Sequence, residues 1–173
     1  MAVAGCLIRV SNHAQLAACC ALDIIATMAK IRDRVREELT DEDRQSICDL
    51  KDHDTPTLDA HVGLNTGRIN AGVVGTNNPR FKLFGDTVNM ASRMESTCPH
   101  GCVQISAATE RCIKEHFVLK DRGLVQIKGK GEQLTYLLEG HLAGAPRVRQ
   151  PILCQKVEAG GSSNRERNDG SLT

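Results

Sequence analysis

The sequence FKLFGDTVNMASRMES at residues 81–96 places a predicted strand directly before a predicted helix. The strand is expected over residues 80–84, where apolar and cationic side chains are interleaved. A glycine, an aspartate and a threonine at residues 85–87 then open the helix, which continues to about residue 96. Asp86 is expected to be the N-cap, a position that the helix dipole favours for a carboxylate.

Asn89 and Arg93 form the first candidate site. They are four residues apart, so they lie one above the other on the same helical face. An amide and a guanidinium stacked in this way form a donor pair suited to a phosphate or a ribose, and arginine adds planar, permanently charged recognition. The alternative is an ordinary exposed polar face, on which Arg93 pairs with a nearby acid such as Glu95.

Toward the C-terminus, short strands and one short helix are predicted. They are a strand at 102–105, a helix capped by Ser106 that ends near residue 115, a hairpin of residues 117–120 and 124–128 around Arg122 and Gly123, and a last strand at 134–138. Lys128 and Lys130, which are separated by a glycine, form the second candidate site, because two ammonium groups at a strand end can meet a polyphosphate. The alternative is a charged turn.

Toward the N-terminus, residues 1–10 are predicted to form a strand and residues 13–39 a long helix that begins after Ser11 or Asn12. Apolar side chains recur along this helix at steps of three and four and predict its buried face: Leu16, Cys20, Ile24, Met28, Ile31, Val35 and Leu39. The charged stretch at 32–54 is expected to fray into a solvated loop.

Residues 60–67 and 69–75 are predicted to form a hairpin around Gly67. Three more glycines interrupt these strands: Gly63, Gly72 and Gly75. Glycine inside a strand indicates a bulge or a close backbone contact. Here the contact could be with a nucleotide, or it could let two subunits pack.

Composition narrows the class of protein. The 173 residues carry 22 Lys and Arg against 21 Asp and Glu, with one Tyr, three Phe and no Trp, which argues against a nucleic-acid-coating module. No uninterrupted apolar run of about 18 residues is found, so no direct membrane contact is expected, and no signal peptide is evident. The frequent hairpins predict an α/β sandwich with a mostly antiparallel sheet. Residues 141–173 are expected to be a disordered tail.

The eight cysteines include no C-x-x-C pair. Cys98 and Cys102, with His100 between them, could form half of a zinc site, but no second half has matching spacing. Reduced intracellular thiols are the better interpretation, and no residue is assigned as a metal ligand.

Three segments together resemble a known family. In order, they are GVVG at 72–75, the block at 81–96, and VQIKGKG at 125–131 with Thr135 and Tyr136 after it. This series is similar to the catalytic domain of class III nucleotide cyclases, in particular the guanylate cyclase branch, over about residues 1–138. The resemblance implies a ferredoxin-like α/β sandwich that occupies residues 1–140 and lacks its N-terminal strand and helices.

The resemblance also implies a reaction and a set of roles. Such cyclases are head-to-tail dimers with sites at the interface, and one subunit holds two Mg²⁺ or Mn²⁺ ions through two aspartates. The other subunit would use Asn89 to orient the ribose, Arg93 to stabilise the transition state and Lys128 to hold the terminal phosphates. Asp86 and Thr87 would add substrate contacts. The implied reaction converts GTP to cyclic GMP and pyrophosphate in cytoplasmic signalling, in a soluble cyclase or the cytoplasmic part of a membrane one.

The chain departs from the family pattern in three places. Both metal aspartates of the family precede the segment that matches Met1, so this chain alone is expected to be inactive, either as a truncated piece or as one half of a site. Lys82 stands where guanylate cyclases usually have Cys and adenylate cyclases Asp. Because lysine only donates hydrogen bonds, it favours guanine if it points into the pocket rather than to solvent. His61 stands where Arg often contacts the terminal phosphates, or it is an ordinary strand histidine.

Two other functions stay open at this point. As a cyclase domain the chain is expected to form a homodimer, or a heterodimer with another cyclase domain. It could instead be a non-catalytic regulatory subunit that pairs with a complete cyclase chain. It could also belong to an adenylate cyclase that makes cyclic AMP from ATP.

Overall fold

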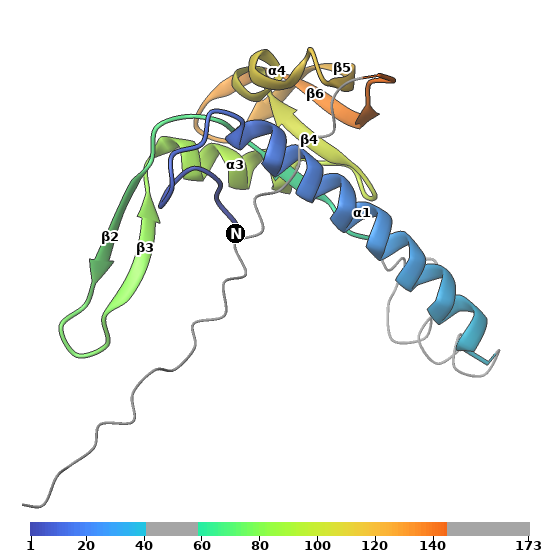
Figure 1. Ribbon diagram of the computed structural model, residues 1–173, viewed down its shortest axis with the longest axis horizontal. Coiled ribbons are helices and arrows are strands. Elements are labelled where there is room, and N and C mark those ends of the chain that lie inside the picture. The colour runs from blue at the N-terminus through green and yellow to red at the C-terminus, as the bar shows by residue number, and fades with distance from the viewer. Residues whose placement is uncertain (41–58, 145–173) are drawn as a thin grey trace, which may run out of the picture.

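The computed structural model describes residues 1–40 and 59–144 (Figure 1). The charged stretch predicted to be a solvated loop and the predicted tail fall largely outside these residues. The last strand ends at His141, one residue beyond the predicted end of the domain.

A four-stranded sheet forms the centre of the fold, with strand order β1-β4-β6-β5. Strand β1 (Val62–Leu64) runs parallel to β4 (Val103–Ser106). Strand β6 (Gly131–His141) is antiparallel to both β4 and β5 (Phe117–Ile127). The prediction of an α/β fold with a mostly antiparallel sheet is therefore confirmed.

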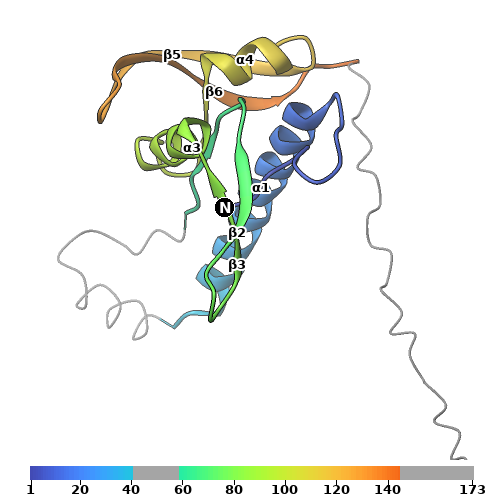
Figure 2. The same ribbon diagram turned by 90° about the vertical axis from the view of Figure 1, so that its left-hand side faces the viewer.

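A separate two-stranded hairpin projects away from this sheet, as Figures 1 and 2 show. It consists of β2 (Asn70–Val74) and β3 (Arg80–Phe84), which pair antiparallel with Gly72 opposite Lys82. The chain passes directly from β3 into helix α3 (Asp86–Ser96), as predicted.

Helices cover both faces of strand β4. Val103 and Ile105 belong to the core cluster that includes helix α1 (His13–Glu38), whereas Gln104 between them contacts Met94 of α3. Because successive strand side chains point to opposite faces, α1 and α3 lie on opposite sides of the sheet (Figure 2). The short helix α4 (Ala107–Ile113) follows β4 and adds Ile113 to the α1 side.

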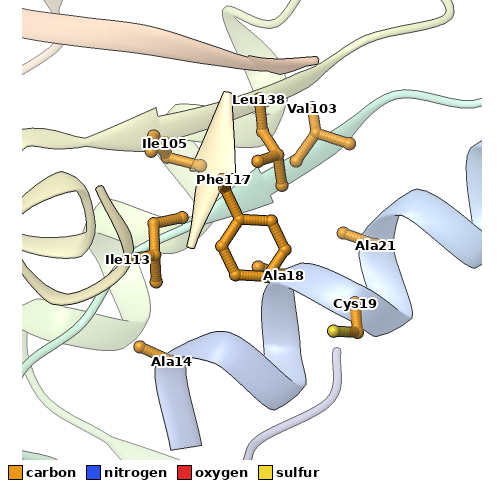
Figure 3. Packing of buried hydrophobic residues seen from close by; sticks show 9 residues of the cluster. All are labelled: Ala14, Ala18, Cys19, Ala21, Val103, Ile105, Ile113, Phe117 and Leu138. Atoms are coloured by element: carbon orange, nitrogen blue, oxygen red, sulfur yellow. The ribbon is translucent and has the colours of Figure 1, made fainter. Parts of the chain in front are cut away.

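Small side chains on α1 form its buried face. Ala14, Ala18 and Ala21 face Phe117 and the sheet (Figure 3). The predicted apolar face of this helix is wrong, because several of its members are exposed: Cys20, Ile24, Ile31 and Val35. The alanines let the helix approach the sheet closely, and hydrophobic periodicity alone does not register that requirement.

Helix α1 is long and apolar enough, by length and composition, to cross a membrane. The sequence did not predict this, because polar residues interrupt the apolar ones along the helix. One such helix is weak support for a membrane span. Its alanine face packs against the sheet, as the core helix of a domain does.

Three predicted strand arrangements are wrong. Residues 1–10 form no strand. Residues 60–75 do not form a hairpin, because β1 pairs with β4 and β2 pairs with β3. Residues 117–127 form one long strand with an irregularity near Gly123 rather than a hairpin, and the true partner of this strand is β6.

The helix cap at Ser106 is confirmed, since its side chain accepts a hydrogen bond from the backbone N–H of Thr109.

Candidate active site

Helix α3 carries the first candidate site on one face. Asp86, Asn89 and Arg93 are spaced i, i+3 and i+7, so they form a single stripe about 10 Å long. Gly85 is the N-cap, which makes Asp86 the first helical residue and corrects its predicted role as the cap. Its carboxylate still lies in the first turn, where the helix dipole favours negative charge.

The opposite face of α3 is fixed against the sheet. A Cβ on Gly63 of β1 would lie 2.0 Å from the backbone nitrogen of Glu95, so only glycine allows this close approach. Met94 is fully buried beside it. At the N-terminal end of α3, the hydroxyl of Thr87 donates to the carbonyl oxygen of Arg68 at 2.6 Å, and the Asn65 amide donates to the Thr87 carbonyl oxygen at 3.0 Å. These contacts set the direction in which the stripe faces.

An ion pair brings the second candidate site to the start of this stripe. Lys130 Nζ lies 2.7 Å from Asp86 Oδ1. Lys130 belongs to the turn that joins β5 to β6, where the backbone of Gly129 and Gly131 has φ values of +76° and +71°. Lys128 lies two residues earlier, at the start of the same turn.

Four predicted site residues have uncommitted side chains. Among the described residues, the side chains of Lys82, Asn89, Arg93 and Lys128 take part in no ion pair or hydrogen bond. The alternative pairing of Arg93 with Glu95 does not form, because Glu95 instead binds His61. These amide and cationic donors therefore remain available to a ligand.

His61 is not brought together with the other candidates. Its Nε2 lies 2.9 Å from Glu95 Oε1, near the C-terminal end of α3 and away from Asp86 and Lys130. Its ring also meets the ring of His100 edge-on at 5.4 Å. In this chain, therefore, His61 lies at the opposite end of the helix from the lysine turn.

A cavity of about 630 Å³ lies beside the opposite face of α3. It is lined by the N-terminal segment, the first turns of α1, residues 63–71, and Thr87 and Ala91 of α3. Asn89 and Arg93 do not line it. The stripe thus lies outside this cavity, with Asp86 and Asn89 exposed and Arg93 half-buried.

The described residues offer no metal centre. Within residues 1–40 and 59–144, no group of three or more His, Cys, Asp or Glu side chains could hold an ion. The Cys98 thiol instead donates to the carbonyl oxygen of Cys102 at 3.3 Å, and burial raises the pKa of the Cys98 thiol. The donor set of residues 1–40 and 59–144 therefore does not fit the pair of divalent ions that the cyclase resemblance implies.

The comparison with family models identifies one domain. The model described as "Adenylate and Guanylate cyclase catalytic domain" matches residues 1–140.

Curated relatives support the guanylate branch. The chain is 41% identical over 129 residues to Guanylate cyclase alpha of Plasmodium falciparum, which covers 73% of this chain and 3% of the relative. It is 48% identical over 106 residues to Soluble guanylate cyclase 89Da of Drosophila melanogaster, which covers 56% of this chain and 16% of the relative. The chain therefore spans only a small part of the length of these relatives.

A solved structure shares the fold. The guanylate cyclase domain of RhGC from Catenaria anguillulae, in complex with GTP, aligns with a TM-score of 0.61 and 35% identity, covering 80% of this chain and 66% of that one. A dimeric guanylyl cyclase domain from Blastocladiella emersonii, whose dimer is described as non-canonical, aligns with a TM-score of 0.52 and 27% identity, covering 80% of this chain and 65% of that one. The fold is thus the ferredoxin-like type expected from the sequence.

Proposed function

The chain belongs to the adenylate and guanylate cyclase catalytic domain family, and from this premise we propose that it is a guanylate cyclase domain that supplies the purine, ribose and phosphate contacts of a site shared by two subunits. The whole protein would convert GTP to cyclic GMP and pyrophosphate in cytoplasmic signalling. The guanylate cyclases among its relatives support the choice of reaction.

One observation carries the proposal. Lys130, in the same turn as Lys128, pairs with Asp86, the first residue of the helix that carries Asn89 and Arg93. The lysine that pairs with Asp86 is Lys130, whereas Lys128 keeps an uncommitted ammonium group. The amide of exposed Asn89, the guanidinium of half-buried Arg93 and the ammonium of exposed Lys128 match the chemistry of the ribose and the phosphates of a nucleoside triphosphate.

The roles follow from where charge develops in the reaction. The ribose 3′-oxygen forms a bond to the α-phosphorus and loses its proton, while the bond from that phosphorus to the bridging oxygen breaks and pyrophosphate leaves. Asn89 would hold the ribose so that the 3′-oxygen faces the phosphorus. Arg93 would stabilise the negative charge that grows on the α-phosphate oxygens, and Lys128 would hold the terminal phosphates.

Lys82 is the proposed purine contact. It is exposed on β3, four residues before the stripe begins. Its ammonium can donate to the O6 and N7 acceptors of guanine, whereas adenine presents an amino donor in place of O6. This chemistry favours GTP over ATP. Thr87 and His61 remain predicted substrate contacts, and their observed partners give each of them a structural role as well. Asp86, the third substrate contact expected from the resemblance, is instead paired with Lys130.

The divalent ions would be held by another subunit. Because the described residues form no metal site, no step assigned to this chain passes through a metal. Asp86 and Asn89 are exposed and the stripe does not line the cavity, which is consistent with a site completed by a second cyclase domain. The guanylyl cyclase domain of Blastocladiella emersonii, whose dimer is non-canonical, supports dimer formation as such.

Complementation tests the proposal. The chain would be mixed with a guanylate cyclase domain that keeps its metal aspartates but carries alanines at its own Asn and Arg helix positions. We expect cyclic GMP to form from GTP with Mn²⁺ only when both chains are present, and cyclic AMP to form from ATP much more slowly. Equal production of cyclic AMP would favour an adenylate cyclase, and no product from either nucleotide would refute the proposal.

A regulatory subunit is the second candidate. The lack of a metal site among the described residues favours it, since such a chain alone would bind nucleotide without turning it over. It predicts that the chain changes the activity of an intact partner but does not restore a partner whose Asn and Arg are mutated.

A further inference from the structure

Resting on the proposed function, we propose that the Asp86–Lys130 ion pair is a positioning device that holds Lys128 at the phosphate end of the site. Asp86 would then act through the turn rather than by touching the nucleotide. The two lysines of the turn at residues 128–131 then have different roles: Lys130 anchors the turn, and Lys128 binds phosphate. Their spacing in the sequence does not show which lysine has which role.

The turn has little else to hold it against α3. Both of its glycines have positive φ, and a Cβ on either would meet no atom within 4 Å, so the turn stands clear of its surroundings. Within the turn, the backbone N–H of Lys130 donates to the carbonyl oxygen of Ile127 at 3.0 Å, which closes the loop but does not orient it. Among the described residues, the only ion pair that links this turn to α3 is the one from Lys130 to Asp86.

The position of Asp86 at the start of the stripe allows the ion pair to position the turn. Asp86 begins the stripe that continues through Asn89 to Arg93. Fixing Lys130 to Asp86 therefore sets the turn at one end of the stripe, and Lys128 is displaced from Lys130 by only two residues. Asp86 also neutralises Lys130, so a polyphosphate arriving there meets one uncommitted ammonium group rather than two.

The pair is exposed, with 41% of the Lys130 side chain and 66% of the Asp86 side chain accessible. Exposed pairs change an equilibrium constant by no more than about fivefold. A positioning role therefore predicts a modest effect on substrate binding, smaller than the effect of removing Lys128 itself.

Kinetics in the complemented two-chain assembly test the role. Asp86→Asn and Lys130→Gln are each expected to raise the KM for GTP by about two- to fivefold and to leave kcat nearly unchanged. Asp86→Glu and the charge swap Asp86→Lys with Lys130→Asp are expected to restore most of the KM. Lys120→Gln, which removes an exposed lysine from strand β5, the strand that leads into the turn, is the matched control and should change nothing.

The decisive comparison measures the effect of Asp86→Asn on the KM for GTP in a chain that already carries Lys128→Gln. If Asp86 acts through Lys128, then Asp86→Asn adds no further increase in KM to Lys128→Gln. The proposal would be overturned if the two variants raised the KM for GTP additively. It would also be overturned if the charge-swapped variant had a KM as high as the single variants.

Acylation of lysines gives a readout that needs no cyclase activity. In the wild-type chain an amine-reactive ester should label Lys130 several times more slowly than Lys128, as measured by mass spectrometry, because the carboxylate holds the Lys130 ammonium. Asp86→Asn should make the two rates equal. Equal rates in the wild-type chain would refute the pairing, whereas a normal labelling ratio in an assembly that makes no cyclic GMP would refute only the proposed function.

Discussion

The Lys130 ammonium lies 2.7 Å from the Asp86 carboxylate, although the two residues are 44 positions apart in the sequence. This contact connects the turn after β5 to the first residue of α3. It leaves Lys128 as the uncommitted lysine of the turn, two residues from the lysine that contacts the start of the stripe. The proposed half-site depends on this meeting of two separate segments.

Replacing Lys82 should change the choice of purine. Lys82→Asp exchanges an ammonium donor for a carboxylate that can accept a hydrogen bond from the adenine amino group. In the complemented assembly we expect the ratio of kcat/KM for GTP to that for ATP to fall by about tenfold or more. Comparing the initial rates of cyclic GMP and cyclic AMP formation measures this ratio.

Arg80→Asp is the control for the Lys82 variant, because Arg80 is exposed on the same strand and gives the same change of charge. If both variants moved the ratio equally, a general charge effect would explain the result and Lys82 would not be the purine contact.

Adding a methyl group to Gly63 should destabilise the domain. The new Cβ would lie 2.0 Å from the backbone nitrogen of Glu95, and neither backbone can move far within the packed sheet and helix. Gly63→Ala is expected to lower the free energy of unfolding by about 3 kcal/mol or more. Urea denaturation followed by circular dichroism measures the loss.

Gly72→Ala is the matched control for this substitution. Gly72 is also a strand glycine, but a Cβ there would meet no atom within 4 Å, so the free energy of unfolding should change by less than about 0.5 kcal/mol. Equal losses for both variants would show that α3 does not pack on Gly63 as described.

Thiol labelling should separate the cysteines by burial. Burial, together with the charge of Asp23, raises the pKa of the Cys19 thiol, and burial raises the pKa of Cys98. A raised pKa means less of the reactive thiolate near neutral pH, so both thiols should react slowly with iodoacetamide there and faster as the pH rises.

The exposed thiols of Cys20 and Cys112 serve as the reference in the same digest. Mass spectrometry should find them alkylated well before Cys19 and Cys98. Labelling of Cys98 at the rate of Cys112 near neutral pH would contradict the packing around residue 98.

Local patterns predicted the helix that carries the site. The strand at residues 80–84 and the helix that follows it were both expected, because their signals lie within a few neighbouring residues. The separation of Asn89 and Arg93 by four residues fixed their common face in the same way. The Asp86–Lys130 contact could not be predicted, because no local pattern links a helix start to a distant turn.

Close packing between elements explains the strand pairing and the buried helix face that the sequence did not predict. The alternation at residues 60–75 suggested a hairpin, yet Gly63 serves close packing of α3 on β1, and β1 pairs with β4 instead. Along α1, the larger apolar residues such as Ile24 are exposed, whereas Ala18 is fully buried. In both cases the space between two elements, rather than hydrophobicity, determines which face is covered.

The central claim is that Arg93 of this chain stabilises the transition state of a cyclase reaction in a site shared with another subunit. The most direct test is the steady-state kinetics of Arg93→Ala in the complemented assembly, with Arg111→Ala on α4 as the control for an exposed arginine. The account predicts that kcat falls by about 10²- to 10³-fold while the KM for GTP changes little. An unchanged kcat, or an equal loss in the Arg111 variant, would contradict it.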